Sequence, residues 1–207
     1  TVERLRPLFP SSRVWVVNAH GKLLSSFPAV RGADLRRGVG VATDDFDFDG
    51  QPEIAAAVAT PKGLAVRIFD PDGVFIRSFS VLVKEFAQGA EIYSVDINSD
   101  GIRELVAAAR HGGTTVAIAS AKGALLNIFS TYAPGVRSGV RLAFYDFDQD
   151  GLQEIVTVPA QGGGPQVRIF GADAELRGQF FAFEKSFRGG LDVAVADRDH
   201  NGVPEII

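Results

Sequence analysis

Four acidic segments hold the residues of this chain whose types and spacing could do chemistry. Each has Asp or Asn at its first, third and fifth positions, Gly at its sixth and Glu at its ninth, and the segments begin at Asp45, Asp96, Asp146 and Asp197. Alternation aims the three odd-numbered side chains into one concavity, and the glycine permits the sharp turn that this needs. Oxygen atoms arranged in this way are the ligands that calcium prefers. The pattern therefore predicts up to four Ca²⁺ ions.

The seventh residue of each loop adds a backbone carbonyl that can point inward, and the glutamate closes the shell. The predicted ligand residues are Asp45, Asp47, Asp49, Gln51 and Glu53; Asp96, Asn98, Asp100, Ile102 and Glu104; Asp146, Asp148, Asp150, Leu152 and Glu154; and Asp197, Asp199, Asn201, Val203 and Glu205. The loops carry 4, 3, 4 and 3 acids. We expect the first and third loops to bind most tightly and the Asp197 loop most weakly, because affinity rises with ligand charge and rigidity.

An EF-hand and a metal-free hairpin are two other interpretations of the acidic loops. An EF-hand needs a glutamate at position 12, where this chain has Ala56, Ala107 and Thr157. A metal-free hairpin loop is also conceivable, since Asp, Asn and Gly are the commonest turn residues. Four copies with a fixed glutamate favour calcium, because three or four carboxylates without a cation would repel one another.

The loops belong to a longer repeat, since their first aspartates are 51, 50 and 51 residues apart. A glycine stands seven residues before each leading aspartate, at Gly38, Gly89, Gly139 and Gly190. Each unit also contains a segment typical of strand, tight turn and strand; these segments are Val14–Phe27, Val66–Phe79, Val116–Phe129 and Val167–Phe180. Four short strands in about 50 residues, without helical periodicity, are typical of a β-propeller blade of kelch-like length. A β-solenoid is the alternative, although its turns are usually shorter.

The order of strands predicts an all-β fold, a single β-propeller domain over residues 1–207. The chain opens with a third-and-fourth strand pair and closes with a first-and-second pair, Leu191–Ile207, with three whole units between them. If these halves pair, they form a split closing blade, which gives four blades and removes exposed sheet edges. The predicted blades and half-blades span about 13–28, 37–80, 88–130, 138–181 and 189–207. The other possibility is that the chain is part of a longer propeller.

Composition excludes several classes of protein. With 46% hydrophobic and 22% charged residues, the chain is typical of a folded globular domain. The net charge is -4 and the basic residues are scattered, so we expect no nucleic-acid partner. The sequence has no apolar run long enough for a membrane span. Cysteine is absent, which removes disulfides and thiolate chemistry.

The acidic loop, Asp-x-Asp-x-Asp-Gly-x-x-Glu-Ile, resembles the FG-GAP and VCBS repeats of integrin alpha-subunit propellers and of many bacterial surface proteins. The segment Gly162–Phe170, followed by Phe187–Gly190, is similar to the form common in bacterial members. The resemblance implies a calcium-stabilised propeller used outside the cell or at its surface for adhesion, ligand binding or assembly. The partner would be a protein or a glycan, and self-assembly through half-blades is a further possibility.

No catalytic constellation is evident from the sequence, and we expect a structural or interaction role without enzymatic activity. His20, His111 and His200 fall at non-equivalent places in the repeat, which favours solvated surface groups over a metal triad. Trp15 replaces Arg67, Ala117 and Arg168 of the other units, so it is a candidate ligand contact. A calcium-dependent lectin, a carbohydrate-active enzyme and a surface-polymer subunit remain alternatives, because propellers host many functions.

Overall fold

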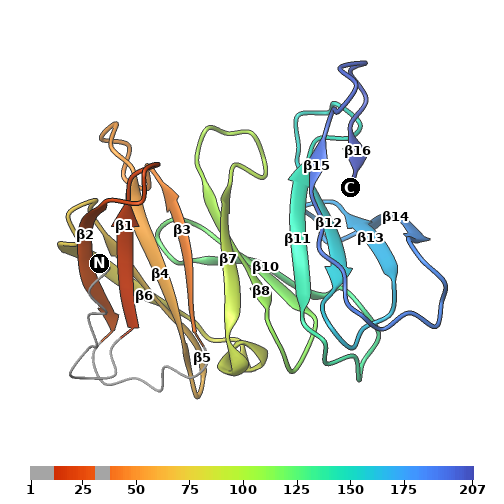
Figure 1. Ribbon diagram of the computed structural model, residues 1–207, viewed down its shortest axis with the longest axis horizontal. Helices are drawn as coiled ribbons and strands as arrows, with labels where there is room; N and C mark the ends of the chain where they lie inside the picture. Colours follow the sequence, from red (N-terminus) through yellow and green to blue (C-terminus); the bar gives the residue numbers. More distant parts are fainter. Residues whose placement is uncertain (1–11, 31–37) are drawn as a thin grey trace.

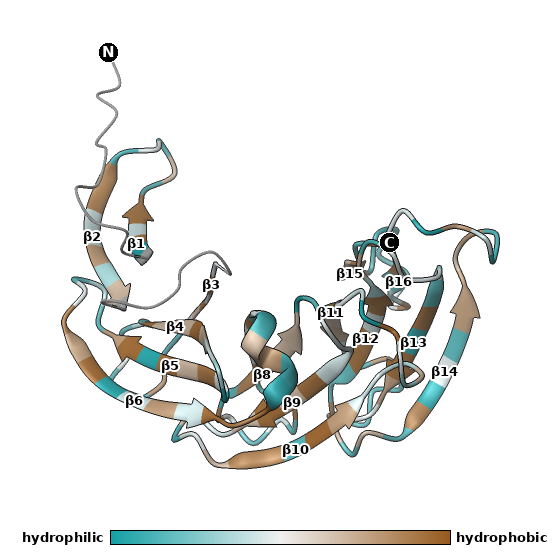
Figure 2. Cartoon of the chain, turned by 90° about the horizontal axis from the view of Figure 1, so that it is seen from below, coloured by the Kyte–Doolittle hydropathy of each residue, from teal (hydrophilic) through white to brown (hydrophobic). Residues whose placement is uncertain are grey.

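The computed structural model describes residues 12–30 and 38–207, so the predicted start of the second unit at residue 37 lies outside the described residues. Separate antiparallel sheets follow one another in chain order along a curved row (Figures 1 and 2). Three sheets have four strands, with orders β3-β4-β5-β6, β7-β8-β9-β10 and β11-β12-β13-β14, and two sheets, β1-β2 and β15-β16, have two strands. The all-β prediction is confirmed.

The strands are short and are joined mostly by hairpins. In chain order they are β1 Ser12–Val17, β2 Leu23–Val30, β3 Val39–Asp44, β4 Glu53–Thr60, β5 Gly63–Phe69, β6 Phe75–Val81, β7 Ala90–Val95, β8 Glu104–Ala109, β9 Thr115–Ala119, β10 Leu125–Ser130, β11 Val140–Tyr145, β12 Glu154–Pro159, β13 Gln166–Phe170, β14 Leu176–Phe181, β15 Val195–Ala196 and β16 Glu205–Ile206. A 3₁₀ helix, η2 Lys84–Gln88, joins β6 to β7. Among the described residues, no helix has the length and apolar character needed to cross a bilayer.

The predicted turns between third and fourth strands are present. The N–H of the fourth turn residue donates to the carbonyl of the first at 2.8–3.0 Å, in the turns Asn18–Gly21, Asp70–Gly73, Ser120–Gly123 and Gly171–Ala174. Gly21, Gly73 and Gly123 have φ of 75°, 88° and 92°, and Ala174 has 69°. Because a positive φ is easy only for glycine, three of these four turns use it.

The core lies between neighbouring sheets. The second strands are almost wholly buried, with all six residues of β8 and of β12 shielded from solvent. Ala55 and Ala57 of one sheet share a cluster with Ala107 and Ala117 of the next, so small side chains let the sheets approach closely. Each of the three remaining pairs of neighbouring sheets is joined by one further cluster. Burial between sheets, rather than within one central core, holds the chain together.

Polar contacts also cross between sheets. The Tyr132 hydroxyl lies 2.8 Å from the carbonyl oxygen of Thr157 and 2.7 Å from that of Gln166, both in the following sheet. Burial raises the pKa of Tyr132 to about 12, so the hydroxyl keeps its proton and can donate it to one of these carbonyls at a time. This tyrosine ties the second complete sheet to the third.

The split closing blade, by contrast, is not formed within this chain. The sheets β1-β2 and β15-β16 have no strand pairing with each other, and they lie at opposite ends of the row (Figures 1 and 2). Each packs on its sequence neighbour, through a cluster that includes Val14 and Phe69 at one end and Val158 and Val195 at the other. This packing turns the sheets through an open arc, so the two edges do not meet. The predicted closure of four blades into a ring is wrong for a single chain in this structure.

Candidate metal loops

Each acidic loop joins the first strand of a sheet to the second and is closed by its own leading aspartate. In the first loop, the N–H of Asp49 donates to Asp45 Oδ1 at 3.1 Å, and the N–H of Gly50 donates to Asp45 Oδ2 at 2.9 Å. The same pair of bonds recurs at Asp96, Asp146 and Asp197. The fifth side chain then accepts from the N–H of the seventh residue at 2.7–2.8 Å. The four copies therefore share one backbone path.

Two positions in each loop need the left-handed region of φ. The fourth residue has φ between 55° and 65° in all four loops; these residues are Phe48, Ser99, Gln149 and His200. The sixth residue is always glycine, with φ between 83° and 90°. A Cβ on Gly50 would meet no atom within 4 Å, so its conformation, rather than lack of space, requires glycine there. The turn gathers the odd-numbered side chains on one side of the loop.

The glutamate at position 9 begins the second strand and is buried in three loops. Glu53 and Glu104 are each 3% exposed, and Glu154 is 5% exposed. One carboxylate oxygen of each accepts the N–H of the second loop residue, at 2.7, 3.2 and 2.8 Å. Burial raises the pKa of all three, the backbone hydrogen bond opposes this, and the loop's own aspartates raise it further. A buried acid beside other acids favours either a proton or a cation.

The carboxylates converge to different degrees. Ligand atoms of Asp45, Asp47, Asp49 and Glu53 lie within 4.8 Å of one another, and so do those of Asp146, Asp148 and Glu154, and of Asp197, Asp199 and Glu205. The described residues of the Asp96 loop form no such group of three acids. The first loop therefore gathers four acids and the third loop three, although each of these two loops carries four acids in its sequence.

Two loops replace an acid with asparagine, and the amide takes part in the loop. Asn98 Nδ2 donates to Asp100 Oδ2 at 3.0 Å, and Asn201 Nδ2 donates to Asp199 Oδ2 at 3.0 Å. These bonds join the third and fifth side chains directly and offset part of the repulsion that a third aspartate would add. The second and fourth loops are thus held together partly by their own amide.

The arrangement fits a hard cation such as calcium. Every loop presents several carboxylate or amide oxygens, and each position 9 glutamate has one carboxylate oxygen beyond the one that accepts the backbone N–H. In each loop, the predicted ligands at positions 1, 3 and 5 lie in the loop itself, and the one at position 9 lies at its edge, where the second strand begins. The carbonyl contributions of Gln51, Ile102, Leu152 and Val203 remain predictions, and their N–H groups bond to the fifth side chain.

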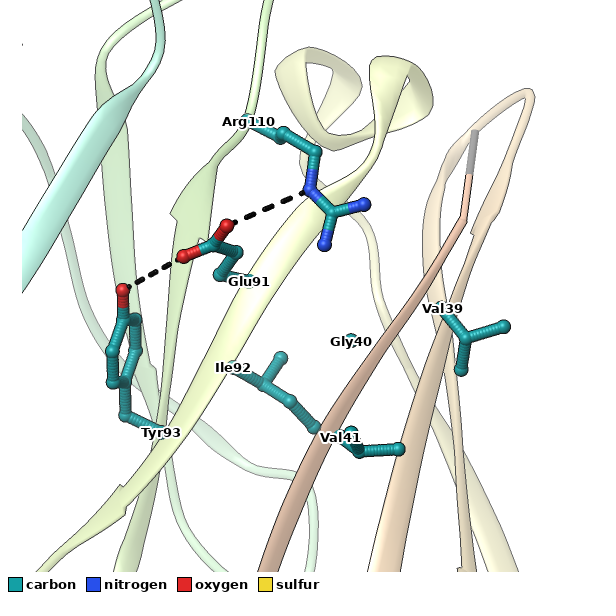
Figure 3. A pocket seen from close by; sticks show the side chains of 7 residues that line it. All are labelled: Val39, Gly40, Val41, Glu91, Ile92, Tyr93 and Arg110. Carbon is teal, nitrogen blue, oxygen red and sulfur yellow. Dashed lines mark hydrogen bonds and ion pairs between the residues drawn. The ribbon is translucent and has the colours of Figure 1, made fainter. Parts of the chain in front are cut away.

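A second candidate site lies between β3 and β7. This cavity of about 390 Å³ is lined by Val39, Gly40, Val41, Glu91, Ile92, Tyr93 and Arg110 (Figure 3). Glu91 accepts a hydrogen bond from the Tyr93 hydroxyl at 3.0 Å and pairs with Arg110 at 3.8 Å and with Arg141 at 3.2 Å. Burial and the neighbouring Glu91 raise the pKa of Tyr93. The carboxylate is thus neutralised by its own surroundings.

Sequence reasoning did not identify the Glu91 cluster. Glu91 and Tyr93 come from β7, Arg141 comes from β11, and Arg110 comes from the link after β8. None of them recurs as a motif in the repeat, so no local signal joins them. The three histidines are exposed, and none of them joins a group of potential metal ligands in the described part of the chain. Trp15 lies on β1 with 58% of its surface exposed, and its role as a ligand contact remains a prediction.

Comparisons with known proteins agree with this repeat. Residues 96–157 match the family model for an FG-GAP-like repeat, which confirms the resemblance inferred from the acidic loops over that stretch. No curated protein matches the chain.

Among solved structures, a protein of unknown function from Bacteroides caccae shares 13% sequence identity with a TM-score of 0.51, over 90% of this chain and 58% of its own length. This likeness shows the fold alone, and the chain spans little more than half of that protein. Raptor from Chaetomium thermophilum also shares 13% identity, with a TM-score of 0.43, over 88% of this chain and 20% of its own.

Proposed function

From the FG-GAP-like repeat at residues 96–157, we propose that the chain is an extracellular, calcium-stabilised module of the β-propeller type. It acts by binding other macromolecules rather than by catalysis. The observation that carries this proposal is the fourfold recurrence of one loop, in which the glutamate that begins the second strand accepts the N–H of the second loop residue. In three of the four loops this glutamate also lies within 4.8 Å of the loop's aspartates.

Calcium would neutralise the acids of each loop and so fix the hairpin between the first and second strands. The residues that would hold it in the first loop are Asp45, Asp47, Asp49 and Glu53, with their counterparts in the other loops. The aspartates already shape the loop through backbone hydrogen bonds, so they need little rearrangement to accept an ion. Calcium is therefore assigned a structural role.

A binding role is supported by the state of the acids outside the loops. Glu91 is paired with arginines, and Asp44 accepts a hydrogen bond from Ser94 at 2.9 Å and pairs with Arg103 at 3.4 Å. Both carboxylates are therefore engaged in contacts within the fold, which favours a structural role for them over a catalytic one. The extracellular location follows from the affinity expected for such sites, about 10⁻⁴ to 10⁻³ M, which suits calcium concentrations outside the cell.

Thermal unfolding with and without calcium tests the proposal. At a calcium concentration about ten times the dissociation constant, each filled site adds roughly 1.4 kcal/mol to the free energy of unfolding, so several sites raise the melting temperature by many degrees. Magnesium at the same concentration should have a smaller effect, because it demands a tighter octahedral geometry.

A matched pair of variants separates the loops from general charge effects. Asp49→Asn removes an acid from the first loop, whereas Asp72→Asn removes an exposed acid from the turn Asp70–Gly73. We expect Asp49→Asn to reduce the calcium-induced rise in melting temperature and Asp72→Asn to leave it unchanged. Equal melting temperatures in calcium and in chelator would refute the calcium role.

A further inference from the structure

Neighbouring sheets of this chain pack on one another through the same kind of side-chain contact, which repeats from one pair of sheets to the next. A phenylalanine near the end of one sheet's fourth strand packs on the next sheet's third strand and on the turn after it. A Cβ added to Gly73 would overlap the ring of Phe27, and a Cβ added to Gly123 would overlap the ring of Phe79. The ring centroids of Phe27 and Phe69 are 4.8 Å apart, and those of Phe129 and Phe170 are 5.1 Å apart.

A hydrogen bond accompanies each of these aromatic contacts. The residue two positions before the phenylalanine donates to the carbonyl of the second turn residue in the next sheet. The three bonds are Ser25 Oγ to Pro71 O at 3.2 Å, Arg77 Nη1 to Ala121 O at 2.7 Å and Asn127 Nδ2 to Ala172 O at 3.0 Å. The third strand also reaches back, since Arg67 donates to Ala29 O at 3.0 Å and Arg168 donates to Thr131 O at 2.8 Å.

At the two ends of the row, the same positions lack their counterparts. Phe180, which corresponds to Phe27, Phe79 and Phe129, is 45% exposed. At the other end, Val17 corresponds to Phe69 and is 52% exposed. A Cβ on Gly21, the equivalent of Gly73, would meet no atom within 4 Å. One end therefore has the phenylalanine without its turn, and the other has the turn without its phenylalanine.

Trp15 extends this complementarity. It occupies the position of Arg168, whose guanidinium carbon lies 5.2 Å from the centroid of the Tyr132 ring in the preceding sheet. The equivalent of Tyr132 in the last complete sheet is Phe183, which is 58% exposed, as is Trp15. Beside Phe183 is a cavity of about 400 Å³, lined by Phe180, Phe183, Phe187, Leu191, Val193 and Ile207 among others.

From these observations we infer that the β1-β2 hairpin of one copy docks on the last complete sheet of a second copy. The N-terminal face, made of Trp15, Val17 and Gly21, covers the C-terminal face, made of Phe180, Phe183 and Phe187. Trp15 enters the apolar cavity, and β1 takes the place of the third strand beside β16. This inference names a partner for the proposed binding function and rests on it.

A second copy is the occupant for two reasons. The N-terminal face belongs to this chain and occupies the same repeat positions that, in three internal contacts, face the fourth strand of the preceding sheet. Among the described residues the same two faces lie at opposite ends of the row (Figure 2), so a second copy of the chain can bring them together. Such a contact is heterologous, head to tail, and it generates rings or open filaments.

The contact between copies is weaker than those within the chain. The position that corresponds to Ser25, Arg77 and Asn127 is Gly178, which has no side chain to donate to the Ala19 carbonyl. The aromatic burial therefore carries the association, and assembly depends on concentration.

Trp15 provides a direct readout because it is the only tryptophan of the chain. Sedimentation velocity and tryptophan emission are measured together on the full chain in calcium, up to a concentration of about 100 µM, where weak interfaces associate. The expected result is a mass that rises with concentration, accompanied by a blue shift as Trp15 becomes buried. Trp15→Ala and Phe183→Ser should each weaken association by at least about tenfold. The control is Leu126→Ser, at a position 56% exposed on β10, which should have no effect.

Mixing the two variants identifies the head-to-tail arrangement. A Trp15→Ala chain keeps an intact C-terminal face, and a Phe183→Ser chain keeps an intact N-terminal face. Each is monomeric alone, but their mixture should form dimers that do not grow further.

Three results would overturn the inference. The first is a monomer with exposed Trp15 at every concentration. The second is a monomer whose tryptophan emission is blue-shifted at every concentration, which means that the two faces close within one chain. The third is an oligomer that neither variant weakens. Melting temperatures in calcium and in chelator are recorded on the same samples. A calcium-dependent rise without assembly would defeat this inference alone and leave the proposed calcium role standing.

Discussion

Exchanging one oxygen ligand between the first two loops should move their calcium affinities in opposite directions. Asp47 is one of four acids that converge within 4.8 Å in the first loop. Asn98 has the equivalent place in the second loop, where its amide donates to Asp100. Asp47→Asn makes the first loop resemble the second, and Asn98→Asp makes the second resemble the first.

The expected size of the effect follows from the charge removed. Two unit charges 4 Å apart in water interact by about 1 kcal/mol, so one carboxylate and a divalent ion interact by about 2 kcal/mol, or roughly 30-fold in affinity. Asp47 is exposed, and salt screens its charge, which reduces the effect to about tenfold. The amide of Asn still offers an oxygen, so the site weakens without being abolished.

The effect on the calcium-free protein has the opposite sign. Removing Asp47 relieves repulsion in the first loop, so the melting temperature in chelator should rise. Asn98→Asp adds an acid and removes the amide hydrogen bond to Asp100, so the melting temperature in chelator should fall. A variant that merely disturbs folding would lower stability in both conditions.

Calorimetric titration with calcium, paired with melting in chelator, measures both effects. The double variant Asp47→Asn with Asn98→Asp is the control, because it keeps the net charge of -4. Its total binding curve should stay close to that of the unaltered chain. If the two single variants changed calcium affinity in the same direction, or not at all, the number of acids would not set affinity here.

Two further variants test contacts that support the loops and sheets. Tyr132→Phe leaves a buried carbonyl without its donor and should cost about 1–2 kcal/mol, or roughly 3–6 °C in melting temperature. Tyr145→Phe, at a residue that is only partly buried, should cost much less. Gly151→Ala forces alanine to φ 90° in the third loop and should lower the free energy of unfolding by roughly 1–2 kcal/mol, as measured with denaturant. Gly164→Ala, where an added Cβ finds space, should be nearly neutral.

The sequence predicted well those features that are set by neighbouring residues. Four short strands were expected in each unit, and each of the three complete sheets contains four strands. The loops were predicted because the acids that form them lie within nine positions of one another, and the turns because a positive φ selects glycine. Such local requirements leave a visible pattern in one sequence.

Features set by packing between sheets were not predictable in the same way. The residues that donate across the repeated contact are Ser25, Arg77 and Asn127, which share no side-chain type, and their acceptors are backbone carbonyls. Ring closure failed as a prediction because strand counting shows which edges could pair but does not determine how far each sheet is rotated from its neighbour. The last strand pair is also shorter than expected, only Val195–Ala196 and Glu205–Ile206.

The hydrogen bond that closes each acidic loop also affects how the protein ages chemically. The fifth and sixth loop residues are Asp-Gly in three loops and Asn-Gly at Asn201. In such pairs the glycine nitrogen can attack the preceding side-chain carbonyl to form a succinimide, which hydrolyses to aspartate or isoaspartate. In every loop that glycine N–H donates to the leading aspartate at 2.9 Å, so the attacking nitrogen is engaged while the loop stays closed. Deamidation of Asn201 therefore reports how often its loop opens.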